Sequence, residues 1–164
     1  MGGEKRLGSI DVLVICHGQY IPGSEDLDDD FERIFKVNFR SVKKLIDTFD
    51  EADDTHIVIV TSIAGVRGSR RGDHLYSASK SAAHALVLSG HPRNPGLLLS
   101  GVAPGPVYSK MVEESDYDRS SLLETTEVAE LIEEILERPD ANHRKIHTIE
   151  RIDGTTIVDV ISPK

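Results

Sequence analysis

The 164-residue sequence predicts an α/β protein, in which a parallel β-sheet is covered by helices on both faces. Short runs rich in Val, Ile and Leu, typical of buried parallel strands, alternate along the chain with longer amphipathic segments typical of helices. The apolar and charged fractions, 38% and 29%, are those of a globular protein. Because the chain contains no repeat and no linker, we expect residues 1–164 to form a single domain.

The individual elements follow from these patterns. The expected strands are Asp11–Cys16, His56–Ser62, Gly96–Ala103 and the extended stretch Lys145–Val160, which has a candidate turn at Asp153 and Gly154. The expected helices are Phe31–Phe49, Tyr76–Ser89 and Glu124–Glu137. The first helix follows three aspartates, Asp28 to Asp30, whose carboxylates suit a helix N-terminus.

Composition excludes several function classes. The formal charge of −9 argues against nucleic acid or an anionic membrane as a partner. The single cysteine, Cys16, excludes an intrachain disulfide and suits a reducing compartment. The N-terminus does not resemble a secretory signal and no apolar run is long enough to span a bilayer, so we expect a cytoplasmic protein. The acidic runs are not accompanied by His or Cys, and we expect no metal site.

The segment from Ser62 to Lys80 contains the best candidates for catalysis. Ser62 ends an apolar strand, and Tyr76 and Lys80 are four residues apart, on one face of an expected helix. A cation beside a phenol lowers the pKa of that phenol, and such a tyrosine can exchange a proton with a carbonyl or alcohol oxygen. Each residue alone has an ordinary interpretation, as a turn serine or an exposed helix pair. The order strand, serine, loop, tyrosine, lysine is much rarer.

This order resembles the short-chain dehydrogenase/reductase family, whose signature is a serine followed by Tyr-x-x-x-Lys. Three further segments match in the family's order: Gly8–Val14 is similar to the fourth strand and its lead-in, Phe35–Asn38 to the helix of the active-site asparagine, and Val102–Ser109 to the Pro-Gly loop after the sixth strand. The resemblance covers about residues 7 to 150. It implies a Rossmann-like three-layer sheet, NAD or NADP as cofactor, and a small-molecule carbonyl or alcohol as substrate.

The resemblance also implies roles for individual residues. Tyr76 would be the catalytic acid/base, and Lys80 would lower its pKa and hold the nicotinamide ribose. Ser62 would orient the substrate oxygen, and Asn38 would support a proton relay through water. The implied cofactor-binding residues are Gly18, Tyr76, Lys80, Pro104, Gly105, Val107 and Ser109.

The sequence departs from the family pattern at several places, and two of them bear most on function. Family members begin with a strand, a Gly-rich turn and a helix that bind the pyrophosphate, whereas Met1–Leu7 lead directly into the segment similar to the fourth strand. The first three strand–helix units are therefore expected to be missing, which leaves the catalytic, C-terminal half of a Rossmann-like domain with about four strands. In addition, Ile15–Gly18 stands where the family has Asn-Asn-Ala-Gly, and only the glycine is kept. We interpret His17 as an ordinary loop histidine.

Two function classes remain open at this point. The chain is an NAD(P)-dependent oxidoreductase, or it is a non-catalytic relative that acts as a binding or oligomerisation module. The four catalytic residue types favour the first class, and the missing pyrophosphate loop favours the second. The basic loop Arg67–Asp73 either attracts an acidic ligand or is simply solvated, and we favour the solvated loop.

The missing units also bear on assembly. Without the first strand, Asp11–Cys16 becomes an exposed sheet edge, and an apolar edge recruits another strand. In the resembling family, the helices that carry Asn38 and Tyr76 form the usual dimer face. We therefore expect a homo-oligomer, a two-fold dimer, held by these helices or by pairing through the exposed strand.

Overall fold

The computed structural model describes residues 10–23, 28–49, 55–69, 73–112 and 117–163, and these form a five-stranded sheet. The strands lie in the order β1-β2-β3-β4-β5; the first four are parallel and β5 is antiparallel to β4. They are β1 (Val12–Ile15), β2 (His56–Val60), β3 (Leu98–Pro104), β4 (Lys145–Ile152) and β5 (Thr155–Ile161). The expected α/β class is therefore confirmed, and the expected parallel sheet is confirmed for four strands, whereas the fifth is antiparallel.

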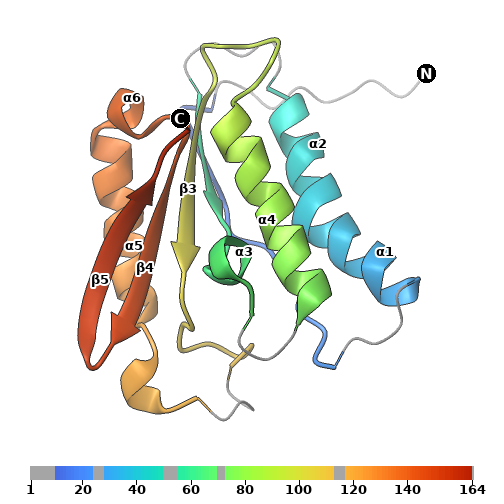
Figure 1. The fold of residues 1–164 in the computed structure, drawn as a ribbon. Helices are drawn as coiled ribbons and strands as arrows, with labels where there is room; N and C mark the ends of the chain where they lie inside the picture. The colour runs from blue at the N-terminus through green and yellow to red at the C-terminus, as the bar shows by residue number, and fades with distance from the viewer. Residues whose placement is uncertain (1–9, 24–27, 50–54, 70–72, 113–116, 164) are drawn as a thin grey trace.

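Helices cover both faces of the sheet, as Figure 1 shows. On one face lie α1 (Asp29–Phe35), η1 (Lys36–Arg40), α2 (Ser41–Asp47) and α4 (His74–Ser89), and on the other lies α5 (Thr125–Glu137). Three short elements complete the described chain: α3 (Ala64–Arg67), η2 (Arg119–Ser121) and α6 (Pro139–Asn142). None of the helices in the described ranges is long and apolar enough to cross a membrane.

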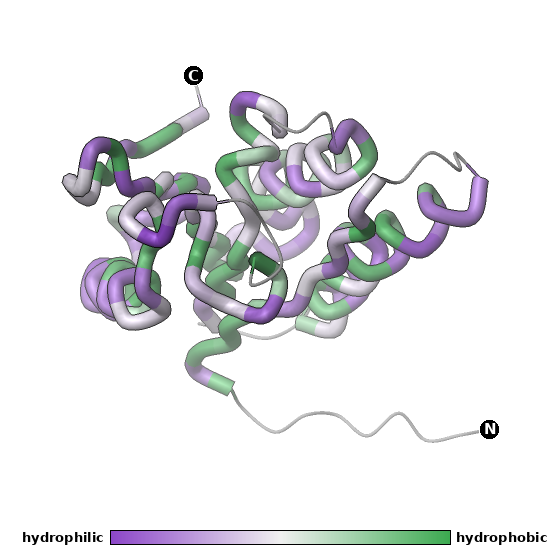
Figure 2. The backbone as a smooth tube through the Cα atoms, turned by 90° about the horizontal axis from the view of Figure 1, so that it is seen from below, coloured by the Kyte–Doolittle hydropathy of each residue, from purple (hydrophilic) through white to green (hydrophobic). Residues whose placement is uncertain are grey.

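The core has two parts, one on each face of the sheet. Along β2, Ile57 and Ile59 belong to the cluster beneath α2 and α4, whereas Val58, between them, belongs to the cluster beneath α5. This alternation explains why the strand is apolar at every position, as a parallel strand between two helical layers must be. Figure 2 shows the hydrophobic stretches gathered in the middle of the molecule.

The expected number of about four strands is one too low. The stretch read as extended, Lys145–Val160, forms a hairpin of β4 and β5 joined by Asp153 and Gly154. Both linking residues have positive φ, 50° and 77°, which is the backbone of the two-residue turn that Asp-Gly favours. The candidate turn was therefore correct, and it reverses the chain to add an antiparallel strand.

The helix expected at Phe31–Phe49 also differs in one respect. It runs continuously through α1, η1 and α2, but its middle, Lys36–Arg40, is a π-helical turn. Such turns are rare and often occur at functional sites. Here the π-helical turn contains Asn38, whose side chain is buried.

Within the described ranges, β1 is an edge strand that pairs with β2 alone. The amide of His56 donates to the carbonyl of Asp11, so in this parallel ladder residues 11, 13 and 15 face β2 and the backbone groups of Val12 and Val14 face outward. The side chains of Val12 and Val14 are also 42% and 37% exposed. An apolar edge of the expected kind is therefore present in the described structure.

Candidate active site

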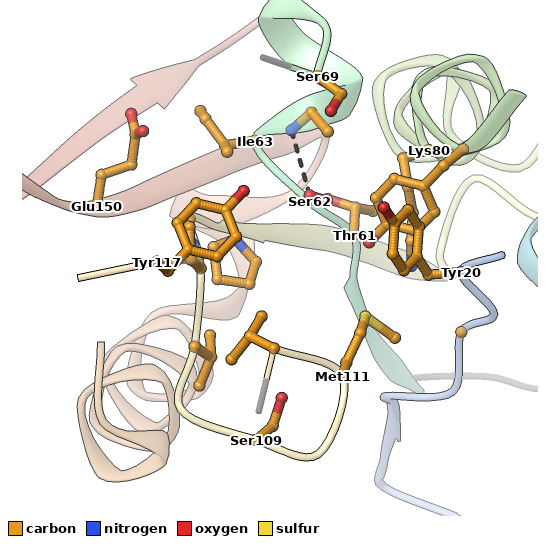
Figure 3. Close-up of a pocket in the computed structure, with 18 of the residues that line it drawn as sticks. Tyr20, Thr61, Ser62, Ile63, Ser69, Lys80, Ser109, Met111, Tyr117 and Glu150 are labelled. Carbon is orange, nitrogen blue, oxygen red and sulfur yellow. Dashed lines mark hydrogen bonds between the residues drawn. The ribbon is translucent and has the colours of Figure 1, made fainter. Parts of the chain in front are cut away.

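A cavity of about 570 Å³ opens where the parallel strands end. Its walls come from the loops after β1, β2 and β3 and from the far end of β4, which is where open α/β sheets bind ligands. Figure 3 shows Tyr117 on one side of this cavity and Tyr20 on the other, with Ser62 between them at the end of β2.

Tyr76 and Lys80 lie on one face of α4, as their spacing predicts. The Lys80 ammonium lies 5.7 Å from the centre of the Tyr76 ring, and Lys80 is only 5% exposed. Tyr20 also contacts Tyr76 edge to face, with ring centres 5.4 Å apart. Both Tyr76 and Lys80 line the cavity.

Ser62 is held in place by the strand that precedes it. The amides of Thr61 and Ile63, on either side, donate to the carbonyls of Val102 and Pro104 in β3 at 2.7 and 2.9 Å. The Ser62 hydroxyl accepts the amide of Ala64 at 3.2 Å, and it lies close enough to the Tyr76 phenol to lower the pKa of that phenol. Two hydroxyl groups thus meet beside a buried ammonium.

Asn38 lies behind the cavity and connects three segments. Its side-chain amide donates to the carbonyl of Gln19 and to the hydroxyl of Ser79, both at 2.9 Å, and its oxygen accepts the amide of Gln19 at 2.7 Å. Ser79 in turn donates to the carbonyl of Tyr76 at 2.7 Å. The observed contacts of Asn38 therefore fix the loop after β1 against α4.

The surroundings of Gly18 explain why a glycine stands at this position of the loop after β1. A Cβ atom on Gly18 would lie 2.9 Å from the Lys80 ammonium and 3.6 Å from the Asn38 side-chain oxygen. Any larger residue would therefore displace Lys80 from its position beneath Tyr76. His17, nearby, hydrogen-bonds Ser41 at 2.6 Å and does not line the cavity.

Burial raises the pKa of Tyr76 and lowers the pKa of Lys80. Desolvation raises the pKa of the Tyr76 phenol, and Asp73 and Tyr117 add to the rise, whereas the Ser62 hydrogen bond lowers it. Desolvation also lowers the pKa of Lys80 to about 8. The expectation that Lys80 depresses the pKa of Tyr76 is therefore wrong for the chain alone, because the loss of water around both groups outweighs their interaction at this distance.

The residues expected to bind the cofactor lie around the same cavity. Gly18, Tyr76, Lys80, Pro104, Gly105, Val107 and Ser109 all line it. The Lys80 ammonium has no hydrogen bond or ion pair within the described ranges, and a buried cation of this kind needs a polar partner. The hydroxyl groups of a nicotinamide ribose would supply one. The described residues thus fit the nicotinamide end of a dinucleotide.

Several cavity residues were not recognised from the sequence. Tyr20 donates to Asp73 at 3.1 Å, which places its ring against Tyr76, and Tyr117 and Met111 line the cavity from the loop after β3. Glu150 of β4 forms an ion pair with Arg67. No local pattern marks these residues, because only the fold brings their segments together.

The Arg67–Glu150 pair also bears on the basic loop. Because the one arginine of this loop that the structure describes is neutralised by Glu150, it offers no free positive charge to an acidic ligand. Arg70 and Arg71 lie outside the described residues. Within the described ranges, no group of three or more His, Cys, Asp or Glu side chains is placed to hold a metal ion.

Comparison with solved structures gives many similar folds. A short-chain dehydrogenase/reductase of Brucella melitensis, described as a glucose/ribitol dehydrogenase, is 29% identical with a TM-score of 0.69, over 82% of this chain and 60% of that one. A blue fluorescent protein from a metagenomic library, solved with NADPH, is 27% identical with a TM-score of 0.67, over 78% of this chain and 58% of that one. A Burkholderia xenovorans protein described as a short-chain dehydrogenase/reductase is 25% identical with a TM-score of 0.69, over 85% of this chain and 63% of that one.

The chain therefore spans about three fifths of the length of the structures that it matches. No curated protein matches it. The sequence profile of the short chain dehydrogenase family matches residues 3–120, well over half of the chain. Together with the fold, this match shows that the chain belongs to the short-chain dehydrogenase/reductase family.

Proposed function

We propose that the chain carries the catalytic part of an NAD(P)-dependent oxidoreductase that interconverts a carbonyl and an alcohol. One observation carries this proposal: the hydroxyl groups of Ser62 and Tyr76 meet beside the buried Lys80 ammonium, in a cavity shared with Pro104 and Gly105. A relative with 27% identity was solved with NADPH, which supports a nicotinamide cofactor.

In this proposal, each side chain acts on a stated atom. The Tyr76 hydroxyl donates its proton to the substrate oxygen during reduction and removes it during oxidation. Its raised pKa keeps it protonated at neutral pH and so suits it to the donor role. Ser62 donates a hydrogen bond to the same oxygen, and Lys80 binds the ribose hydroxyls. The nicotinamide cofactor supplies or accepts the hydride when it is bound.

Asn38 has a second role in this proposal besides the contacts that it makes. It would support a water-mediated relay that returns a proton to Tyr76 through Lys80. The pKa of Lys80, lowered to about 8, suits such a relay, because the amine then gains and loses a proton near neutral pH. In support of this role, Asn38 lies in the π-helical turn, and a Cβ atom on Gly18 would be 2.9 Å from the Lys80 ammonium and 3.6 Å from the Asn38 side-chain oxygen.

We expect these 164 residues by themselves to bind NAD(H) or NADP(H) with a Kd in the millimolar range or weaker, roughly −4 kcal/mol. A Rossmann site derives much of its affinity from backbone amides at a helix N-terminus that bind the pyrophosphate, and the sequence contains no such Gly-rich strand–turn–helix ahead of β1. Isothermal titration calorimetry tests this expectation, and a micromolar Kd would contradict it.

The alternative is a non-catalytic binding or oligomerisation module, favoured by the exposed edge of β1. A measurement of turnover at saturating cofactor distinguishes an enzyme from a non-catalytic module. We expect the chain, given several millimolar NADPH or NADH and a panel of aldehydes and ketones, to oxidise the reduced cofactor in a carbonyl-dependent manner. Absence of turnover with every carbonyl, under conditions where calorimetry shows the cofactor to be bound, would refute the enzyme proposal and leave the module.

We expect the chain to form a two-fold homodimer through the β1 edge or through the face of α1–α2 and α4. Val14→Pro separates these routes, because the backbone of Val14 faces outward and its amide is not needed for pairing with β2. If β1 is the contact, Val14→Pro should be monomeric and Val14→Thr dimeric in multi-angle light scattering. A wild-type monomer of 18.0 kDa at micromolar concentration would contradict the dimer.

A further inference from the structure

His84 connects the segment that carries Ser62 to the helix that carries Tyr76 and Lys80. It lies on α4 one turn after Lys80, is 6% exposed, and its Nε2 atom is 2.6 Å from the Thr61 hydroxyl. We propose that His84 is a positioning residue, which holds the Ser62 hydroxyl within hydrogen-bond reach of Tyr76. The catalytic meaning of this role rests on the proposed function, but the positioning itself does not.

The contacts of His84 flank Ser62 on both sides along the chain. Thr61 precedes Ser62 directly, and its hydroxyl is 2.6 Å from Nε2 of His84. The backbone of Gly65, three residues after Ser62, lies close enough to the same ring to raise the pKa of the imidazole. The turn from Thr61 to Gly65 thus contacts α4 at both ends through one side chain.

The hydrogen-bond balance assigns the tautomer of His84. The Thr61 hydroxyl has one proton, which it donates to the Val102 carbonyl at 3.0 Å. The same hydroxyl therefore accepts from the ring, so Nε2 carries the proton of the neutral imidazole. Burial lowers the pKa of His84 to about 4, with the Lys80 charge acting in the same direction, so the ring is neutral at pH 7.

The residues around His84 are closely packed. A Cβ atom on Gly65 would lie 2.9 Å from the Cε1 atom of His84 and 2.7 Å from the backbone carbon of Lys80. The Ser81 hydroxyl also donates to the Gly65 carbonyl, at 2.6 Å. Loss of the imidazole would remove the bond between Thr61 and α4, while the backbone bonds of Thr61 and Ile63 to β3 and the Ser81 bond to Gly65 remain.

An ordinary buried histidine would stabilise the fold without affecting Tyr76, and the pKa of the Tyr76 phenol distinguishes the two roles. Because the Ser62 hydrogen bond lowers this pKa, its loss should raise it by roughly half to one unit. Replacement of all tyrosines by 3-fluorotyrosine, whose phenol ionises at lower pH, allows the titration to be followed by fluorine NMR in the intact chain. The Tyr76 signal is assigned with Tyr76→Phe.

We expect His84→Leu to raise the pKa of Tyr76 as much as Ser62→Ala does, and the double variant to raise it no further. His84→Gln, whose amide can still donate to the Thr61 hydroxyl, should restore most of the wild-type value. Val87→Ala, a buried change on α4 remote from the loop, should leave the pKa unchanged. These readouts need no turnover, so a failure here is distinct from a failure of the enzyme proposal.

Three results would overturn the proposal. They are an unchanged pKa of Tyr76 in His84→Leu when Ser62→Ala shifts it, an unchanged pKa in Ser62→Ala itself, and an equal shift in Val87→Ala. If His84→Leu does not fold, nitrogen-15 NMR of the wild-type imidazole decides. A neutral ring protonated at Nε2 supports the proposal, and a ring protonated at Nδ1 or at both nitrogens overturns it.

Discussion

Tyr76→Phe is expected to reduce carbonyl turnover by roughly 100- to 10,000-fold, the range that a positioned general acid or base contributes. The substitution removes only the phenolic oxygen, so the ring keeps its edge-to-face contact with Tyr20 and its place above Lys80. Steady-state rates at saturating NADPH measure the effect. A thermal unfolding curve of the variant that matches the wild type would show that the fold is intact.

Tyr20→Phe is the matched control for this prediction. It also removes one phenolic hydroxyl from the cavity wall, but that hydroxyl donates to Asp73 at 3.1 Å. We expect it to keep most of the activity. Wild-type turnover in Tyr76→Phe, or an equal loss in both variants, would mean that Tyr76 does not exchange the proton.

The layers of the fold could be predicted because they depend on local pattern. Continuous apolar runs such as Ile57–Val60 are required where a strand lies between two helical layers, and the sequence displays that requirement directly. The Asp153-Gly154 turn could be predicted as well, because few residue pairs adopt two positive φ values. The π-helical turn at Lys36–Arg40 could not be predicted, because its apolar stripe is the same as that of an ordinary helix.

The residues of the candidate site could be predicted from the order of the sequence motifs. The pKa shifts of those residues could not. Helical spacing brings Tyr76 and Lys80 to one face, but it does not reveal how much water each group loses. In the structure, burial determines the direction of both pKa shifts. Contacts such as Tyr20 with Asp73 and His84 with Thr61 join segments more than twenty residues apart, so no local pattern could indicate them.

Gly65→Ala is expected to destabilise the fold by about 1 to 3 kcal/mol, the usual cost of an added group in a closely packed interior. The new Cβ atom would lie 2.7 Å from the backbone carbon of Lys80 and 2.8 Å from the amide nitrogen of Ser81. Backbone atoms cannot rotate away as a side chain can, so α3 and α4 must separate. The melting temperature should fall by about 2 to 4 °C for each kcal/mol.

Gly96→Ala is the matched control, because its Cβ atom would meet nothing nearer than the Asn94 side-chain oxygen at 3.4 Å. We expect it to change the free energy of unfolding by less than about 0.5 kcal/mol. Separation of α3 from α4 in Gly65→Ala should also break the Ser62–Tyr76 hydrogen bond and raise the pKa of Tyr76, whereas Gly96→Ala should leave that pKa unchanged. Urea unfolding and the tyrosine titration measure the two effects. Wild-type stability in Gly65→Ala would mean that the close approach of α3 to α4 does not exist in solution.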